Sequence, residues 1–263
     1  MPNARRTMLA LVVFIAGAIG LTHTMLDAQA PTAGYVAVGD SIEFGLGDDL
    51  TADGIGYVEP FGAFLSVVLG QPVQLQNFSF PGAETRDIRQ QQLPLAVAAV
   101  KAHRPVVVSW GGGGNDIGRV LLTPQMATCI RTPSCLGRFN GLWNEAEAAI
   151  DRTIAALREA AGPGARILMR TQYNAVAKSG CAPPELVALG NAVLEGAPGT
   201  VLDQGLNDRI RGIAGKYKAT LVDLFVPFAL NPNLFVAADC IHPSGAGYHT
   251  IETLFEAAYV AGP

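Results

Sequence analysis

Charged residues are scarce in this chain. Lys, Arg, Asp and Glu make up 15% of its 263 residues, and the formal net charge is −4. Nucleic-acid binding calls for a clustered basic face, and the composition gives no support for such a partner. Long apolar runs are also rare. Although 49% of the residues are hydrophobic, they fall in short runs separated by glycine and proline, which is typical of a buried parallel sheet.

Several nucleotide, metal and nucleophile motifs are missing as well. The glycine run Gly111–Gly114 is not followed by Gly-Lys-Ser/Thr, and the G-x-G-x-x-G spacing of dinucleotide sites does not occur, so a phosphate cradle is not expected. None of the seven serines lies in G-x-S-x-G, which argues against the nucleophile elbow of α/β-hydrolases. There is no C-x-x-C and no nearby histidine pair. We therefore expect neither a metal nor an organic cofactor.

The first thirty residues have the pattern of a secretory signal peptide. Two arginines precede the uncharged apolar stretch Met8–Leu21, and Ala28-Gln29-Ala30 resembles a signal-peptidase site. The apolar stretch is shorter than the about 20 residues of a membrane span. Pro31 hinders cleavage directly before it, so an uncleaved anchor remains the alternative. We expect a secreted or periplasmic protein without a membrane span after cleavage.

Residues 31–263 are long enough for a single domain with a sizeable core, which we expect to be monomeric. Strand and helix patterns alternate along it, and this order predicts a parallel sheet covered on both faces. Two stretches, 121–141 and 174–198, are expected to be loop insertions. The expected strands are 35–38, 73–78, 105–110, 166–171 and 220–225, and the expected helices are 58–69, 95–102, 142–161, 201–217 and 247–260.

All four cysteines follow the predicted signal peptide. An even number in an exported protein favours disulfides, with three possible pairings. We predict Cys129–Cys135, because this pair brackets one short loop, together with Cys181–Cys240. A zinc site is the competing interpretation, but the spacing of the cysteines does not favour it.

Polar residues follow four of the predicted strands. Ser41 comes after the first strand, Gly82 after the second, Asn115 after the third, and Asp239 and His242 after the fifth. Ligands of open α/β sheets bind beyond the carboxyl ends of the strands. Because parallel strands end at one rim of the sheet, we expect these residues to converge there.

A nucleophilic serine needs a base to remove its proton. His103 precedes the third strand at the opposite end, where we expect a solvated side chain, and His249 in the last helix has a surface or packing role. His242 lies three residues after Asp239 and before Pro243. The aspartate can then fix the imidazole tautomer and leave Nε2 for the serine proton, while the proline restricts the histidine backbone. The alternative is that both residues only cap a helix.

Acyl transfer also needs donors for the oxyanion that forms. The backbone N–H groups of Ser41 and Gly82 and the side-chain amide of Asn115 are the candidates. The alternative for Gly82 is an ordinary turn after proline.

The remaining polar and aromatic candidates have structural roles in our interpretation. The acidic residues after Ser41 are expected to be a solvated loop beside the cleft rather than a glycosidase pair or a calcium loop; they are Glu43, Asp48, Asp49 and Asp53. We expect Asp40 and Asp116 to support their turns through local hydrogen bonds, and Asp223 to be structural. Trp110 and Phe44 fit either an acyl pocket or the core.

These blocks resemble those of the SGNH/GDSL hydrolase family: Gly39-Asp40-Ser41, Gly82, Gly113-Gly114-Asn115-Asp116 and Asp239-Cys240-Ile241-His242-Pro243. Isoleucine replaces the leucine of the family name, a conservative change. The resemblance implies a flavodoxin-like three-layer α/β/α sandwich around a five-stranded parallel sheet. It also implies Ser41 as nucleophile, His242 as base and Asp239 as its orienting carboxylate, with oxyanion donors from Ser41, Gly82 and Asn115.

The function that the resemblance implies is that of an exported serine ester hydrolase of the esterase or lipase type. Its substrate would be a small-molecule, lipid or acylated-glycan ester. A carbohydrate O-deacetylase is the first alternative, favoured if Trp110 and Tyr173 are exposed as sugar platforms in a shallow cleft. A catalytically silent protein that binds glycans or lipids is the second.

Overall fold

The computed structural model describes residues 32–47, 56–121 and 133–262. Its contacts separate residues 1–30 from a single compact unit of residues 31–263. The predicted signal peptide therefore lies outside the described residues.

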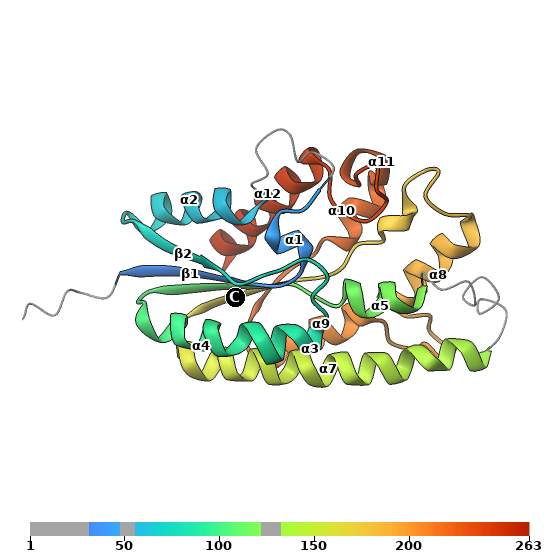
Figure 1. Ribbon diagram of the computed structural model, residues 1–263, viewed down its shortest axis with the longest axis horizontal. Helices are drawn as coiled ribbons and strands as arrows, with labels where there is room; N and C mark the ends of the chain where they lie inside the picture. Colours follow the sequence, from blue (N-terminus) through green and yellow to red (C-terminus); the bar gives the residue numbers. More distant parts are fainter. Residues whose placement is uncertain (1–31, 48–55, 122–132, 263) are drawn as a thin grey trace, which may run out of the picture. The chain divides into compact units, whose positions relative to one another are not determined.

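Five parallel strands form one sheet in the order β2-β1-β3-β4-β5 (Figure 1). This sheet, flanked by helices on both faces, confirms the predicted three-layer α/β/α fold. The order is that of flavodoxin-like folds, in which the chain changes direction across the sheet between β1 and β3. The strands are β1 (Ala33–Val38), β2 (Val73–Asn77), β3 (Val106–Trp110), β4 (Arg166–Arg170) and β5 (Thr220–Val222).

Helices bury both faces of the sheet, so the central strands are apolar without alternation. All six residues of β1 are buried. Because side chains alternate along a strand, Val36 and Val38 pack into one core, and Tyr35 and Ala37 into the other. The first core is covered by α4 (Leu93–Ala102), α7 (Pro133–Ala161) and α9 (Leu206–Lys216), and the second by α2 (Val58–Leu69), α10 (Phe225–Leu230) and α12 (Gly245–Ala261).

The two predicted loop insertions were partly wrong. Helix α7 begins at Pro133, so the end of the first insertion is helical. The second insertion contains α8 (Pro184–Glu195), which starts with a proline in its first turn and buries Leu189, Val193 and Leu194. Its cysteine and neighbouring prolines masked that apolar spacing in the sequence.

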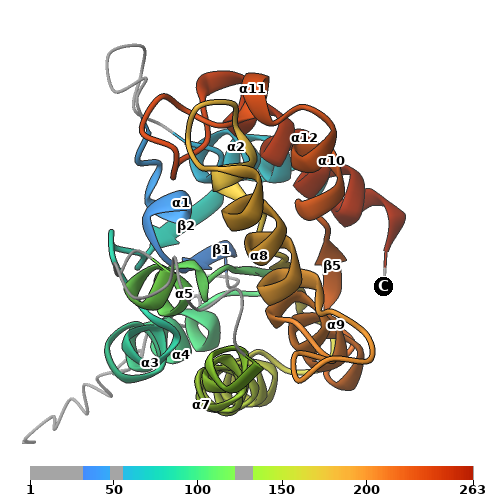
Figure 2. The same ribbon diagram turned by 90° about the vertical axis from the view of Figure 1, so that its right-hand side faces the viewer.

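Short helices begin several of the loops at the carboxyl ends of the strands (Figure 2). Helix α1 (Ser41–Phe44) follows β1, α3 (Thr85–Asp87) follows β2 and leads through a π-helical turn at Ile88–Gln92 into α4, and α5 (Gly114–Leu121) follows β3. A 3-10 turn, Ala175–Ala177, follows β4, and α11 (Pro232–Phe235) lies beyond β5. The β1 and β3 loops flank the switch point of the sheet, where ligands of such folds bind.

Candidate active site

Ser41 lies at the first position of α1, directly beyond β1. The preceding residue, Asp40, caps this helix by accepting the N–H of Ile42 at 3.0 Å, and Gly45 ends it with a left-handed φ of 86°. A glycine is favoured there because a side chain is strained in that conformation. The short turn presents the Ser41 hydroxyl at the rim of the sheet, where the side chain is 8% exposed.

His242 and Asp239 complete a hydrogen-bonded chain with this serine. The Nε2 atom of His242 lies 3.0 Å from Ser41 Oγ, and its Nδ1 atom lies 2.5 Å from Asp239 Oδ2. With Nδ1 protonated toward the carboxylate, Nε2 is the acceptor that can take the serine proton. The two residues do not cap the following helix, because its N-cap is Ser244.

The loop that carries His242 is held in a closed shape by its own backbone. The N–H of Ala237 donates to the carbonyl of His242, and Val236 pairs with Pro243 in an isolated bridge. Asp239 Oδ1 accepts the N–H groups of Ile241 and His242 at 2.9 Å each. Burial raises the pKa of Asp239, but the hydrogen bonds from His242 and Ile241 outweigh this effect and hold the pKa below its usual value.

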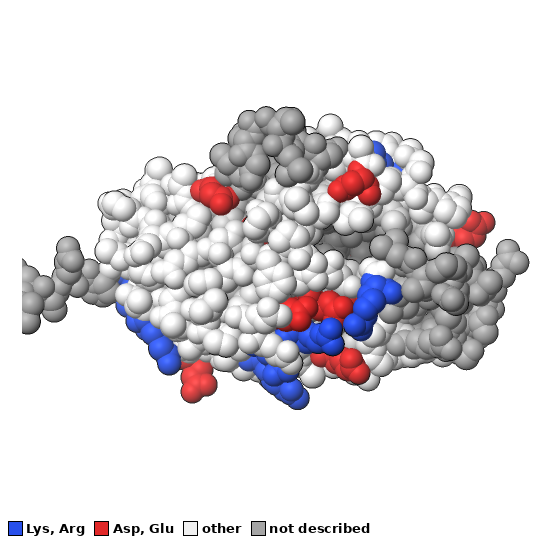
Figure 3. All heavy atoms as spheres, viewed as in Figure 1, with Lys and Arg blue, Asp and Glu red and all other residues white. Residues whose placement is uncertain are grey.

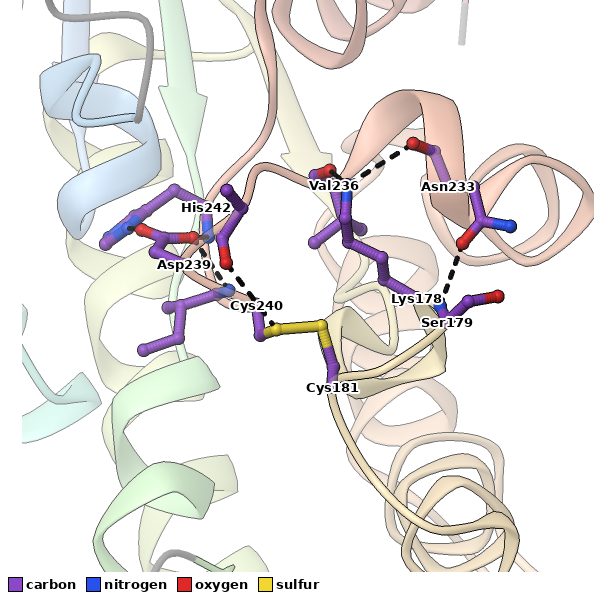
Figure 4. The surroundings of a disulfide bond; sticks show 10 residues. Lys178, Ser179, Cys181, Asn233, Val236, Asp239, Cys240 and His242 are labelled. Atoms are coloured by element: carbon purple, nitrogen blue, oxygen red, sulfur yellow. Dashed lines mark hydrogen bonds and ion pairs between the residues drawn. A yellow bond between two sulfur atoms is a disulfide. The ribbon is translucent and has the colours of Figure 1, made fainter.

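A disulfide and two hydrogen bonds tie this loop to the segment after β4; Figure 4 shows the disulfide and the contact of Lys178 with Val236. Cys240, with a positive φ of 63°, is bonded to Cys181. Tyr173 Oη donates to the carbonyl of Ile241 at 2.7 Å, and Lys178 Nζ to that of Val236 at 2.6 Å. Cys129 lies outside the described residues, so the pairing Cys129–Cys135 remains a prediction.

A buried ion cluster lies behind the nucleophile. Arg170, the last residue of β4, is fully buried and donates to Glu43 at 2.5 and 2.8 Å and to Asp40 at 3.0 Å. Tyr57 adds a hydroxyl donor to Glu43 at 3.1 Å. Two of these residues, Asp40 and Glu43, come from the segment around Ser41, so the cluster fastens that segment to the centre of the sheet.

This cluster corrects the prediction for Glu43, which is buried rather than part of a solvated loop. Asp48, Asp49 and Asp53 lie outside the described residues. Asp40 has its expected local hydrogen bond, and it also faces Arg170. Burial raises the pKa of Asp40 to about 6, with the nearby Arg170 opposing and Glu43 adding to the shift.

Asn115 and Gly82, the expected oxyanion donors, lie on neighbouring loops. Asn115 is in the first turn of α5 and lines the same cavity as Ser41 and His242. Its Nδ2 donates to the carbonyl of Ala83 at 3.0 Å, which joins its loop to the one that carries Gly82. Gly82 itself has a left-handed φ of 81°. It is exposed and is not one of the residues that line the cavity.

The cavity beside Ser41 has a volume of about 190 Å³. One part of its lining is Ser41, His242 and Ile241, and the larger part consists of residues of α5, α8 and the segment after β4. Sequence reasoning left this part undefined, because it is built largely from the second predicted insertion.

The remaining histidines differ in their surroundings. His103 was expected to be solvated, but it is 4% exposed and its ring nitrogens lie within 3.2 Å of Thr32 Oγ1 and Gln76 Nε2. Its role is therefore to join chain segments at the amino ends of the strands. His249 is exposed and lies 3.1 Å from Glu252, as expected for a surface residue.

The other residues weighed from the sequence are structural. Asp116 accepts two hydrogen bonds from Thr85, and Asp223 accepts one from Thr171. Trp110 is 1% exposed in the core, while Phe44 is half exposed. Among the described residues, no group of three or more His, Cys, Asp or Glu side chains is arranged to hold a metal ion.

Comparison with known proteins identifies the family. The profile of the GDSL-like Lipase/Acylhydrolase family matches residues 37–250, which include every residue of the candidate site. The chain belongs to this family. No protein of curated function matches the sequence at a significant level.

Solved structures share the fold of this GDSL-like chain at low sequence identity. The lipase Lip_vut3 from a goat rumen metagenome has a TM-score of 0.66 at 21% identity, over 86% of this chain and 97% of that one. Phospholipase A1 from Streptomyces albidoflavus NA297 has a TM-score of 0.58 at 19% identity, over 88% and 100%. A mutant of an acetyl-xylooligosaccharide esterase from Geobacillus stearmophilus has a TM-score of 0.57 at 18% identity, over 89% and 94%. Membership of the family indicates an ester hydrolase.

Sequence reasoning missed the residues that support the site from within. Arg170 and Gln92 are the main examples: Gln92 is buried and exchanges two hydrogen bonds of 2.8 Å with the backbone of Gly39. One signal was available for Arg170, because an arginine at the end of an apolar strand requires a buried acidic partner. Glu43 and Asp40 were the nearest carboxylates to the rim.

The ion cluster yields a prediction for stability. Replacing Arg170 by methionine leaves two carboxylates buried without their partner, and breaking such a pair costs about 3–5 kcal/mol. We expect the free energy of unfolding of Arg170→Met, measured by urea denaturation, to fall by this amount. The exposed Arg152 on α7 provides the control, since Arg152→Met should change it by less than about 0.5 kcal/mol. Equal stability of the two variants would contradict the role of the cluster.

The disulfide yields a second prediction. Its cysteines are 59 residues apart, and closing a loop of this size is worth about 4 kcal/mol in the chain-entropy model. We expect the double variant Cys181→Ser/Cys240→Ser to unfold at lower urea and to lose ester hydrolysis before it loses secondary structure. Activity and circular dichroism are measured along one urea titration. A double variant whose two transitions coincide with those of the wild type would refute this tether.

Proposed function

We propose that this protein is a serine ester hydrolase that works through an acyl-enzyme on Ser41. The observation that carries the proposal is the chain of contacts from Asp239 through His242 to the Ser41 hydroxyl, at 2.5 and 3.0 Å. It lies at the switch point of the sheet, beside a cavity that can hold a substrate.

The geometry supports a two-step reaction. Ser41 Oγ attacks the ester carbonyl carbon while His242 Nε2 takes its proton, and the carbonyl oxygen becomes an oxyanion. The tetrahedral intermediate collapses when His242 returns the proton to the leaving alcohol. Water then attacks the acyl-enzyme with the same proton transfers, which releases the acid and restores Ser41.

Asp239 has the supporting role in this reaction. Its lowered pKa keeps the carboxylate ionised, so it holds the Nδ1–H tautomer of His242 and stabilises the imidazolium that forms. The N–H of Ser41, the N–H of Gly82 and the amide of Asn115 are our proposed oxyanion donors. No metal or organic cofactor enters the proposed reaction.

The test is hydrolysis of p-nitrophenyl esters by single variants. We expect Ser41→Ala and His242→Ala to lower kcat by at least about 10⁴, and Asp239→Asn by a similar factor through loss of the correct tautomer. His249→Ala and Ser179→Ala replace exposed residues outside the site and should retain wild-type rates.

Two results would overturn the assignment. Equal activity of wild type and Ser41→Ala would exclude this serine as the nucleophile. A wild-type protein that is inert toward a broad ester panel would instead favour the silent glycan- or lipid-binding alternative.

The substrate class favoured by the site is an apolar or lipid ester. A carbohydrate O-deacetylase, like the esterase of acetyl-xylooligosaccharides with the same fold, would gain support from exposed aromatic platforms. Trp110 and Tyr173 are only 1% and 6% exposed, and Tyr173 is engaged with the backbone of Ile241. These two side chains therefore do not provide such platforms.

We also propose export, with cleavage of a signal peptide near residue 30. The Cys181–Cys240 disulfide supports it, because disulfides persist in oxidising compartments. Within the described residues, no helix is long and apolar enough to cross a membrane. We propose a monomer that binds ester substrates and has no nucleic-acid partner.

The proposal of export predicts the mature N-terminus. When the full chain is expressed in a secreting bacterial host, N-terminal sequencing should find a start near Pro31 in the extracytoplasmic fraction. Alkylation without reduction should then modify no cysteine. Recovery of the chain in the membrane fraction with Met1 intact would show the uncleaved anchor instead.

A further inference from the structure

One wall of the cavity beside Ser41 is a single face of α5. Gly114, Asn115, Ile117 and Gly118 all line it. Helical positions separated by three and four residues share a face, so Gly118 stands near the middle of that face, one turn inward from Asn115. A Cβ built at Gly118 would meet no atom within 4 Å. The absence of a side chain at this position therefore leaves space in the cavity.

The opposite wall is a face of α8, formed by Gly190, Val193 and Leu194. This helix is fixed close to the segment after β4. A Cβ at Gly190 would lie 2.6 Å from Asn174 Oδ1, and Asn174 Nδ2 donates to Val187 and Asn191 on the same helix. The position of the α8 wall is thus set by direct packing on Asn174.

The interior of the cavity suits an uncharged apolar group. Asp40 is the one Asp, Glu, Lys or Arg among the described residues of its lining, and the Asp40 carboxylate is paired with Arg170. The amide nitrogens of Gln172 and Asn174 already donate to the backbone. The apolar side chains of the lining include Ile117, Val176, Val193 and Leu194.

The volume limits the size of this group. An apolar cavity of about 150 Å³ holds one benzene molecule. The cavity here measures about 190 Å³, which on the same scale gives room for a chain of roughly six to eight carbons. Ser41 and His242 line the same space as residues of the two helices.

We propose that the slot between α5 and α8 binds the acyl chain of the ester, that it accepts chains of roughly six to eight carbons, and that Gly118 sets its depth. The inference rests on the proposed ester hydrolysis at Ser41. The acyl carbon attacked by Ser41 would lie beside Ser41 and His242, with the alcohol directed to solvent.

The first measurement is kcat/KM of the wild type for p-nitrophenyl esters from acetate to dodecanoate. Each methylene that enters the slot should raise kcat/KM about fourfold, up to six to eight carbons, beyond which the value should fall. A profile that decreases steadily from acetate, or one that rises to dodecanoate, would overturn the proposed size.

The second measurement uses Gly118→Leu, which fills the slot at mid-depth. We expect the ratio of octanoate to acetate hydrolysis to fall at least tenfold. Gly212→Leu is the matched control, since Gly212 is a helical glycine on α9 with equally open space but lies outside the cavity. Its ratio should equal that of the wild type. If Gly118→Leu leaves the ratio unchanged, the slot does not hold the acyl chain.

Two further measurements distinguish the possible causes of a change in this ratio. Gly118→Ala adds one methyl group and favours the helix, so it should shift the same ratio in the same direction by a smaller factor even if the leucine variant fails to fold. A series of acetate esters with alcohols of increasing length should show no preference in the wild type. A preference there that Gly118→Leu abolishes would place the alcohol in the slot and overturn the proposal. Loss of all hydrolysis in the wild type would concern the proposed function instead.

Discussion

The buried pairing of Arg170 with Glu43 and Asp40 is the interaction on which the position of Ser41 depends. Taking these charges out of water costs several kcal/mol per ion, which only close, charge-assisted geometry offsets. Arg170 supplies this geometry through hydrogen bonds of 2.5–3.0 Å to the two carboxylates. The cluster also requires glycine at two neighbouring positions. A Cβ at Gly39 or Gly111 would lie 2.2 or 2.0 Å from a carboxylate oxygen of Glu43, so the glycines before Ser41 and after β3 make room for it.

The partner of Ser41 is positioned by a different kind of constraint. The loop of His242 is mostly exposed and lacks a core of its own, so backbone pairing, the Asp239 carboxylate, the Tyr173 hydroxyl and the disulfide hold it in place. Charged side chains are unevenly spread over the described surface. On the face shown in Figure 3, charged side chains gather over α3 and α5, where Arg86 and Arg119 pair with Glu84. Much of the described surface above them carries none.

The sequence was sufficient to predict the sheet and to select candidate site residues that lie together in the structure, and insufficient for what surrounds them. The strands were predictable because strands such as β1 and β3 are buried on both faces and read as continuous apolar runs. Ser41, Asn115, Asp239 and His242 were found because their residue types and strand-end positions point to one chemistry. The cavity was not predictable, because a cysteine and prolines masked the apolar spacing of α8 and because the position of this helix depends on the contact of Gly190 with Asn174. His103 was misjudged because its burial depends on Thr32 and Gln76, which are distant in sequence.

The segment after β4 contacts both the loop of His242 and α8. Through Tyr173 and Cys181 it is fastened to the loop of His242, and through Asn174 it seats α8 against the cavity. A change in this segment would therefore alter the lining of the cavity and the position of His242 together. Grafting the segment from a relative to change the accepted ester would also change what holds the imidazole, unless the cysteine pair and the tyrosine were transferred together.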